Sequence, residues 1–152
     1  MKILICGLPG SGKSTLAQPL AELLNAVWLN ADSVRGKYEG APFIENGWDF
    51  SKAGRVAQAT RMKYLADGIV LANKIVVADF ICPTQETREL FDADFTVFMD
   101  TIKEGRYADT NAMFEKPTNC DYHVSDWFIN AQDQLLPVVQ RYMNLKIKGD
   151  LE

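Results

Sequence analysis

The sequence predicts an α/β fold in which helices cover both faces of a parallel sheet, a three-layer α/β/α arrangement. Short apolar runs alternate with amphipathic segments along the chain, as in consecutive strand–helix–strand units. A glycine-rich stretch lies directly between the first apolar run and the first amphipathic segment. The length of 152 residues suits one sizeable core, so we expect a single domain over residues 1–152.

Hydrophobic spacing sets the expected elements in order. Short runs rich in aliphatic and aromatic residues predict strands at 2–6, 26–29, 75–78, 95–99 and 122–124. Helical spacing predicts helices at 12–24, at 52–72 behind Ser51 as N-cap, at 85–91, and from 126 onward. Pro19 predicts a kink in the first helix, and Pro137 an interruption of the last. We expect a loop over 38–49 and an irregular, lid-like segment over 102–121.

Composition limits the classes of function. A net charge of −4 argues against a protein that coats nucleic acid, although a local basic pocket stays open. No apolar run approaches the roughly 18 residues that span a membrane, so we expect a cytoplasmic protein. The three cysteines lack metal-ligand spacing, and we expect Cys6 and Cys82 to be buried, reduced thiols. Residues 151–152 are expected to be left over from cloning.

Residues 7–14, Gly-Leu-Pro-Gly-Ser-Gly-Lys-Ser, match the phosphate-binding pattern G-x-x-x-x-G-K-[ST]. The glycines let the backbone wrap around a phosphate chain, and the next helix adds the positive end of its dipole. Lys13 would contact the outer phosphates, and the Ser14 hydroxyl would ligate Mg²⁺. We therefore expect ATP and Mg²⁺ here. The expected nucleotide contacts are Gly7, Pro9, Gly10, Ser11, Gly12, Lys13, Ser14 and Thr15.

Asp79 ends the third expected strand, where P-loop proteins often keep a carboxylate for the Mg²⁺ shell. A helix-capping or hydrogen-bonding role is an equal alternative for this residue. Arg106, in the expected lid, can close over phosphates and offset developing charge, which makes it a catalytic candidate. A solvated charge is the alternative for Arg106 and the favoured interpretation for Lys116. His123 is expected to be structural.

The segment Asn30-Ala-Asp-Ser-Val-Arg35 follows the second expected strand. Asp32 and Arg35 are three residues apart, so they lie on one face of a helical turn. At the carboxyl end of a parallel sheet that turn faces the ligand crevice. Asp32 can accept a proton from an acceptor hydroxyl or orient Mg²⁺ through water, and Arg35 can hold an anionic group. The alternative is that Asp32 caps a helix and pairs with Arg35.

Residues 7–17, 29–35 and 80–83 resemble adenylylsulfate (APS) kinases in order and spacing. Phe50-Ser51 followed by Arg55 and Arg61 is similar to that family's F-S-x-x-x-R…R stretch, and the resemblance covers about residues 1–100. It implies ATP-dependent phosphorylation of the 3′-hydroxyl of adenosine 5′-phosphosulfate, which gives PAPS. A small nucleotide substrate, a role in sulfate assimilation and a homodimer are further implications.

The resemblance also implies site roles. Asp32 would be the base or the Mg²⁺ organiser, Arg35 and Arg55 would hold the phosphosulfate, and Phe50 would stack on the acceptor adenine. The other residues implied to bind substrate are Gln58, Arg61, Ile81 and Cys82.

The chain also departs from the family pattern. Gln58 and Thr60 stand where the family has Asn and Arg, and Cys82 stands where it has Ser. Thr84-Gln85 replaces a Tyr-Arg pair, and the segment after Asp100 is shortened. The second hypothesis is therefore a P-loop kinase for another acceptor, such as a polynucleotide 5′-end, a nucleoside or a sugar acid. The third is a noncatalytic nucleotide-binding protein, against which the intact Lys13, Ser14 and Asp32 argue.

Aromatic residues outside these motifs have two interpretations. Phe43 and Trp48, in the expected loop, would suit stacking on a base. The last helix is expected to turn an apolar face toward the core, formed by Trp127, Phe128, Leu135, Val138 and Val139.

Overall fold

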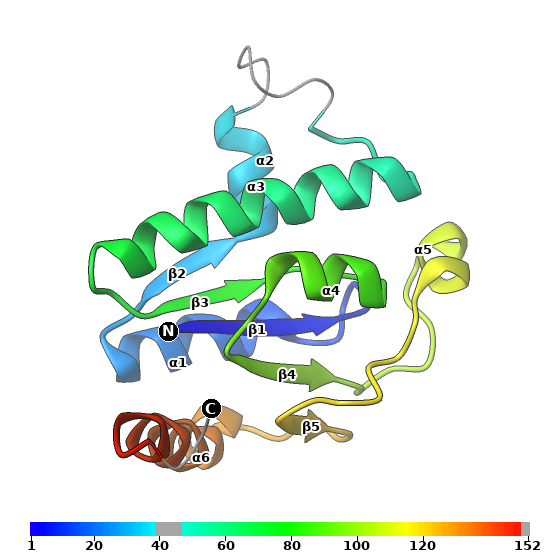
Figure 1. Cartoon of the computed structure of the whole chain (residues 1–152). Coiled ribbons are helices and arrows are strands. Elements are labelled where there is room, and N and C mark those ends of the chain that lie inside the picture. The colour runs from blue at the N-terminus through cyan, green and yellow to red at the C-terminus, as the bar shows by residue number, and fades with distance from the viewer. Residues whose placement is uncertain (39–46, 150–152) are drawn as a thin grey trace.

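A five-stranded parallel sheet forms the centre of the structure, a computed structural model that describes residues 1–38 and 47–149 (Figure 1). The strands are β1 (Lys2–Gly7), β2 (Val27–Asn30), β3 (Val76–Asp79), β4 (Phe95–Met99) and β5 (Tyr122–Val124). Their order across the sheet is β2-β3-β1-β4-β5, and every neighbouring pair is parallel. The expected fold class is confirmed, and each strand lies within one residue of its expected position.

Helices lie on both faces of this sheet (Figure 1). They are α1 (Lys13–Leu24), α2 (Ala31–Tyr38), α3 (Lys52–Leu71), α4 (Gln85–Phe91), α5 (Ala108–Met113) and α6 (Ala131–Ile147). Successive side chains of a strand point to opposite faces, so β1 serves two cores. Ile3 and Ile5 pack with α1 and α6, while Leu4 and Cys6 pack with α3 and α4. Burial of the Cys6 thiol raises its pKa to about 12, and Cys6 and Cys82 are buried free thiols, as expected.

Local capping explains where several helices begin. Ser51 caps α3, accepting a hydrogen bond from the Gly54 N–H at 3.2 Å, as the sequence predicts. Thr84 and Thr87 form a reciprocal capping box at the start of α4. The predicted start of the last helix at 126 is wrong, because Asn130 adopts a left-handed conformation (φ 61°) and the helix begins after it.

Two predictions about irregular segments also need correction. α6 runs through Pro137 without interruption, since Leu135 and Val139 on either side of it are fully buried against the sheet. The expected irregular segment 102–121 contains the short helix α5. Two hydrogen bonds between Asn111 and Gly105, of 2.8 and 2.9 Å, fold the segment before this helix back onto it.

Most of the predicted loop at 38–49, Phe43 included, lies outside the described residues. Within residues 1–38 and 47–149, no helix combines the length and apolar character required to cross a membrane.

Candidate nucleotide-binding and acceptor site

A cavity of about 360 Å³ opens at the carboxyl ends of β1, β2 and β3, where open parallel sheets bind ligands. Most of the predicted site residues line it. These are Pro9, Gly10, Gly12, Lys13, Ser14, Thr15, Asp32, Arg35, Arg55, Gln58, Asp79, Ile81, Cys82 and Arg106. Four predicted residues are not part of the lining: Gly7, Ser11, Phe50 and Arg61.

The glycine loop has the backbone that a phosphate cradle requires. Gly10 and Gly12 have φ values of 84° and 98°, in the left-handed region that favours glycine. A Cβ at Gly7 would lie 2.6 Å from the Met99 carbonyl oxygen, so a side chain there would displace β4. Gly12 is the N-cap of α1, which aims the positive end of that helix at the loop.

The Lys13 ammonium lies over the loop and donates a hydrogen bond to the Leu8 carbonyl at 2.9 Å. Burial lowers the pKa of Lys13 to about 8, against the opposing attraction of Asp79. A phosphate placed in the loop would bring the negative charge that restores the charged form. Lys13 is therefore built to receive an anion.

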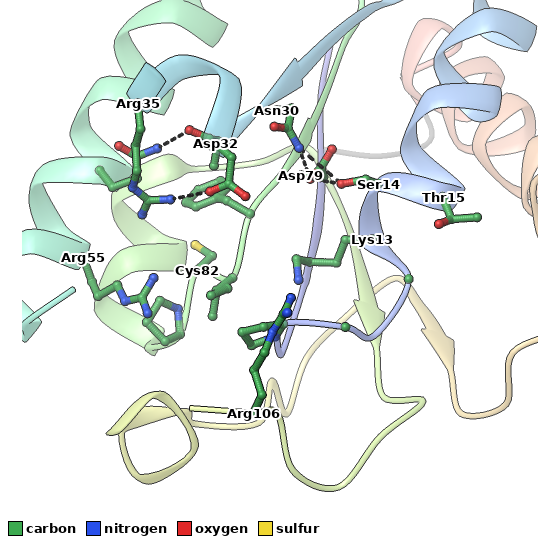
Figure 2. A pocket seen from close by; sticks show the side chains of 18 residues that line it. Lys13, Ser14, Thr15, Asn30, Asp32, Arg35, Arg55, Asp79, Cys82 and Arg106 are labelled. Carbon is green, nitrogen blue, oxygen red and sulfur yellow. Dashed lines mark hydrogen bonds and ion pairs between the residues drawn. The ribbon is translucent and has the colours of Figure 1, made fainter. Parts of the chain in front are cut away.

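A network of hydrogen bonds joins the start of α1 to the ends of β2 and β3 (Figure 2). Ser14 Oγ and Asn30 Nδ2 donate to Asp79 Oδ1 at 3.1 and 2.9 Å, and Trp28 Nε1 donates to Asp79 Oδ2. Burial raises the pKa of Asp79, and the three donors act in the opposite direction. Thr84, and not Asp79, caps the next helix, so the capping alternative for Asp79 does not hold, whereas its alternative hydrogen-bonding role is observed. Two adjacent oxygens, Ser14 Oγ and the Asp79 carboxylate, suit a divalent cation that also binds phosphate.

Two buried arginines form the opposite side of the cavity (Figure 2). Arg35 and Arg55 are 4% and 6% exposed, and burial lowers the pKa of both guanidinium groups. Arg35 pairs with Asp32 at 3.1 Å, as one interpretation predicted, and Arg55 donates to Thr110 Oγ1 at 2.9 Å. Both Nε atoms find no hydrogen-bond partner among the described residues. Since arginine keeps its charge even when buried, this arrangement favours an anionic ligand.

Phe50 contributes to this arrangement from outside the cavity lining. The guanidinium groups of Arg35 and Arg55 lie 5.1 and 4.9 Å from the centre of its ring. Trp48 adds a second ring, 5.9 Å from the Arg35 guanidinium. Because Phe50 is about half exposed, these aromatic residues support the two arginines from the rim of the cavity.

Both polar groups of the Gln58 side chain form hydrogen bonds within the protein. Its Nε2 donates to the Ala31 carbonyl at 3.1 Å, and its Oε1 accepts from Arg61 Nε at 2.8 Å. The amide nitrogen thus holds the start of α2 against α3, while the amide oxygen is used within α3 itself. Arg61 acts through Gln58 and does not line the cavity.

Two cations predicted in the lid-like segment differ in their surroundings. Arg106 lines the cavity, and in Figure 2 its side chain extends toward Lys13. Lys116 is exposed and lies 3.5 Å from Asp100, as its predicted surface role implies. His123 lies 2.9 Å from the same carboxylate and stacks on Phe98, which fits the expected structural role.

Sequence reasoning did not name the cavity-lining Ala31, Phe80 and Pro83 as site residues, nor three residues that hold predicted site residues through hydrogen bonds. Trp28, Asn30 and Thr110 each contact a predicted site residue. Strand register would have found Asn30, which pairs directly with Asp79, whereas nothing local marks Thr110. Trp127, expected in the core face of the last helix, precedes α6 and is 45% exposed, and a Cβ at Gly12 would lie 3.1 Å from its ring. Val138, expected in the same face, is also exposed, whereas Leu135 and Val139 are fully buried as expected.

The phosphate loop between β1 and α1, the carboxylate ending β3 and the parallel sheet define a P-loop enzyme of the kinase type. The chain belongs to the AAA domain family, whose pattern matches residues 3–97.

Individual relatives are more distant. A probable adenylyl-sulfate kinase from Aeropyrum pernix is 28% identical over 86 residues, which cover 57% of this chain and 46% of the relative. A shikimate kinase from Corynebacterium glutamicum is 31% identical over 108 residues, covering 68% and 60%. The chain thus spans less than two thirds of the length of these curated relatives. The APS kinase CysC of Mycobacterium tuberculosis, solved with AMPPNP and APS, shares the fold with a TM-score of 0.74 at 19% identity, covering 94% and 96%.

Proposed function

We propose that the protein transfers the terminal phosphoryl group of ATP to a hydroxyl of a small anionic acceptor, and that this acceptor is adenosine 5′-phosphosulfate. The first part rests on the phosphate loop, where Lys13 and the N-terminus of α1 meet at the cavity. The kinase names of the similar proteins support the same chemistry. Arg106 adds a further cation on the lid side, suited to the charge that spreads over the transferred group.

A divalent cation fits the residues present. Ser14 and Asp79 offer oxygen ligands beside the phosphate loop, and Mg²⁺ prefers one or two such ligands together with phosphate oxygens. When bound, Mg²⁺ would neutralise phosphate charge. Asn30 and Trp28 hold the Asp79 carboxylate, so its orientation is fixed by the protein itself.

Asp32 is the proposed base. Its side chain is 77% exposed at the cavity, so an acceptor hydroxyl can reach the carboxylate. The ion pair with Arg35 occupies one oxygen and leaves the other available. Asp32 would accept the hydroxyl proton as the oxygen attacks the phosphoryl group.

The observation that carries the acceptor assignment is the pair of buried arginines, Arg35 and Arg55, that line the same cavity. Two cations at this depth would bind a dianionic group, such as a phosphosulfate, through charge-assisted hydrogen bonds. Ile81 and Cys82 line the adjacent wall of the cavity. The similarity to adenylyl-sulfate kinases agrees with this assignment.

One observation favours a second acceptor class. The Phe50 ring, which would stack on the adenine of APS, is contacted by both arginines and is absent from the cavity lining. A smaller hydroxylated acid, which has no nucleobase to stack on Phe50, would need only the two arginines for binding. The similarity to a shikimate kinase points in the same direction.

The deciding experiment measures ADP release with MgATP and APS, with AMP, shikimate, gluconate and a 5′-hydroxyl oligonucleotide assayed in parallel. We expect strong turnover with APS alone. Turnover with shikimate or gluconate and none with APS would support the kinase activity and would assign the acceptor to the second class. No turnover with any acceptor, despite tight ATP binding, would contradict the proposal that the protein is a kinase.

Asp32→Asn tests the proposed base. We expect kcat to fall about 10²- to 10⁴-fold, the usual contribution of general base catalysis, with ATP affinity unchanged. Asp133→Asn makes the same change at an exposed residue of α6 outside the cavity lining, so it serves as the control and should retain activity. Unchanged turnover in Asp32→Asn would contradict its role as the base and leave Asp32 only as the ion-pair partner of Arg35.

A further inference from the structure

We propose that Trp28 is a positioning residue for divalent-metal binding, which holds the Asp79 carboxylate in the orientation that a metal–nucleotide complex requires. The proposal rests on the proposed function, where Asp79 is a metal ligand. Trp28 Nε1 donates to Asp79 Oδ2, while Ser14 and Asn30 donate to Oδ1. Because each of its two oxygens accepts from a different side chain, the carboxylate cannot rotate freely about its bond to Cβ.

Strand register explains why Trp28 reaches this carboxylate. In the β2–β3 pair Asn30 lies opposite Asp79, and Trp28 lies opposite Val77. Residues two apart on a strand share a face, so Trp28, Asn30 and Asp79 point to the same side of the sheet. The distance from Trp28 to Asp79 is then the diagonal of the pair, which a long side chain such as tryptophan spans. An indole N–H can only donate, so it is matched to an acceptor such as a carboxylate.

Burial gives this single hydrogen bond its importance. Asp79 is 2% exposed, and an ionised carboxylate at that depth needs hydrogen-bond donors. A carboxylate must also be ionised to bind a metal ion. Trp28 itself is 37% exposed on the edge strand β2, so its indole can be altered without opening a cavity in the core. Residues that orient a metal ligand in this way typically change metal affinity by about 10- to 100-fold when they are replaced.

Trp28→Phe removes the N–H and keeps an aromatic ring of similar shape. Val27→Thr is the matched control, because Val27 is the preceding residue of the same strand and is 39% exposed. Two quantities are measured on each full-length protein: Mn²⁺ affinity in the presence of ADP, by electron paramagnetic resonance, and ADP affinity in EDTA, by calorimetry. We expect Trp28→Phe to weaken Mn²⁺ binding roughly 10-fold and to leave metal-free ADP binding unchanged. Val27→Thr should change neither quantity.

A spectroscopic readout separates positioning from general structure. In ¹⁵N-labelled wild-type protein the indole N–H resonance of Trp28, assigned by its loss in Trp28→Phe, should shift with ADP plus Mg²⁺ and barely move with ADP in EDTA. Equal Mn²⁺ affinity in wild type and Trp28→Phe would overturn this inference alone. So would a parallel loss of metal-free ADP affinity in Trp28→Phe, which marks a structural role. If the wild-type protein binds no Mn²⁺ in the presence of ADP, the metal part of the proposed function is overturned as well.

Discussion

At the scale of single residues, the site is organised by charged side chains whose hydrogen-bonding capacity the protein fills only in part. Lys13, Arg35 and Arg55 are cations, whereas Asp32 and Asp79 are the carboxylates that line the same cavity. Burial lowers the pKa of Lys13 and of both arginines and so favours their neutral forms. The protein alone therefore does not solvate these charged groups fully. An anionic ligand would supply the missing interactions.

The lowered pKa of Lys13 predicts a pH dependence of ATP binding. In the free protein the pKa is about 8, and bound phosphates raise it, so above that pH binding takes up a proton. ATP affinity should therefore fall with rising pH above about 8, by up to about tenfold per pH unit. Calorimetry at pH 7 and pH 9 in buffers of different ionisation enthalpy measures both affinity and proton uptake.

Lys13→Arg provides the control for this pH dependence, because a guanidinium group stays charged throughout the range. It should bind ATP with no proton uptake at pH 9, even if its affinity is lower than that of the wild type. Equal proton uptake in the two proteins would assign the titration to another group.

At the scale of secondary-structure elements, α3 contains two glycines in contrasting surroundings. A Cβ at Gly54 would collide with the Asp49 carbonyl oxygen, whereas one at Gly68 would meet nothing within 4 Å. Gly54→Ala should lower the free energy of unfolding by about 1–3 kcal/mol through this clash. Gly68→Ala should raise it by up to about 1 kcal/mol, since alanine is the better helix former. Urea denaturation of both variants tests the pair, and equal effects would contradict the described start of α3.

The helix α5 is joined to the cavity-lining Arg55 by a hydrogen bond from Arg55 to Thr110. Thr110→Val removes that bond with little change of shape and leaves a buried guanidinium short of an acceptor. We expect the KM for the acceptor to rise about tenfold, as a buried hydrogen bond to a charged group implies, while ATP affinity stays the same. Hydrogen exchange over residues 105–115 should also become faster.

Thr118 supplies the control, because it is exposed and does not line the cavity, so Thr118→Val should behave as wild type. An unchanged acceptor KM in Thr110→Val would show that Arg55 and α5 act independently.

Elements with strong local signals were predictable, and those set by tertiary contacts were not. The strand at 95–99 and the helix at 85–91 match their predicted bounds, because their hydrophobic runs end at clear turn and cap residues. The helix α5 was missed, since six residues carry too little periodicity to predict. In the site, the phosphate-loop residues were predictable from spacing. Trp28 and Thr110 were not, because their contacts are 51 and 55 residues away in the chain.

At the scale of the whole molecule, one sheet separates two hydrophobic cores. Leu135 of α6 is fully buried in the first core, and Met62 of α3 is fully buried in the second. Either residue changed to alanine should lower the free energy of unfolding by about 2–5 kcal/mol. Because both cores share the same strands, we expect each variant to unfold in a single transition. Circular dichroism and tryptophan fluorescence should then give coincident melting curves, and separate curves would show that the cores are independent.

The central position of β1 has a consequence for synthesis on the ribosome. Among the strands of this sheet β1 is made first, yet its neighbours β3 and β4 begin at residues 76 and 95. Its apolar residues Ile3, Leu4 and Ile5 therefore have no strand to pair with until more than half of the chain has emerged. Contacts between segments so distant in sequence form slowly, and an unpaired apolar strand is prone to aggregate. Nascent chains that stall before residue 76 would thus depend on chaperones to stay in solution, whereas the finished protein buries the same strand completely.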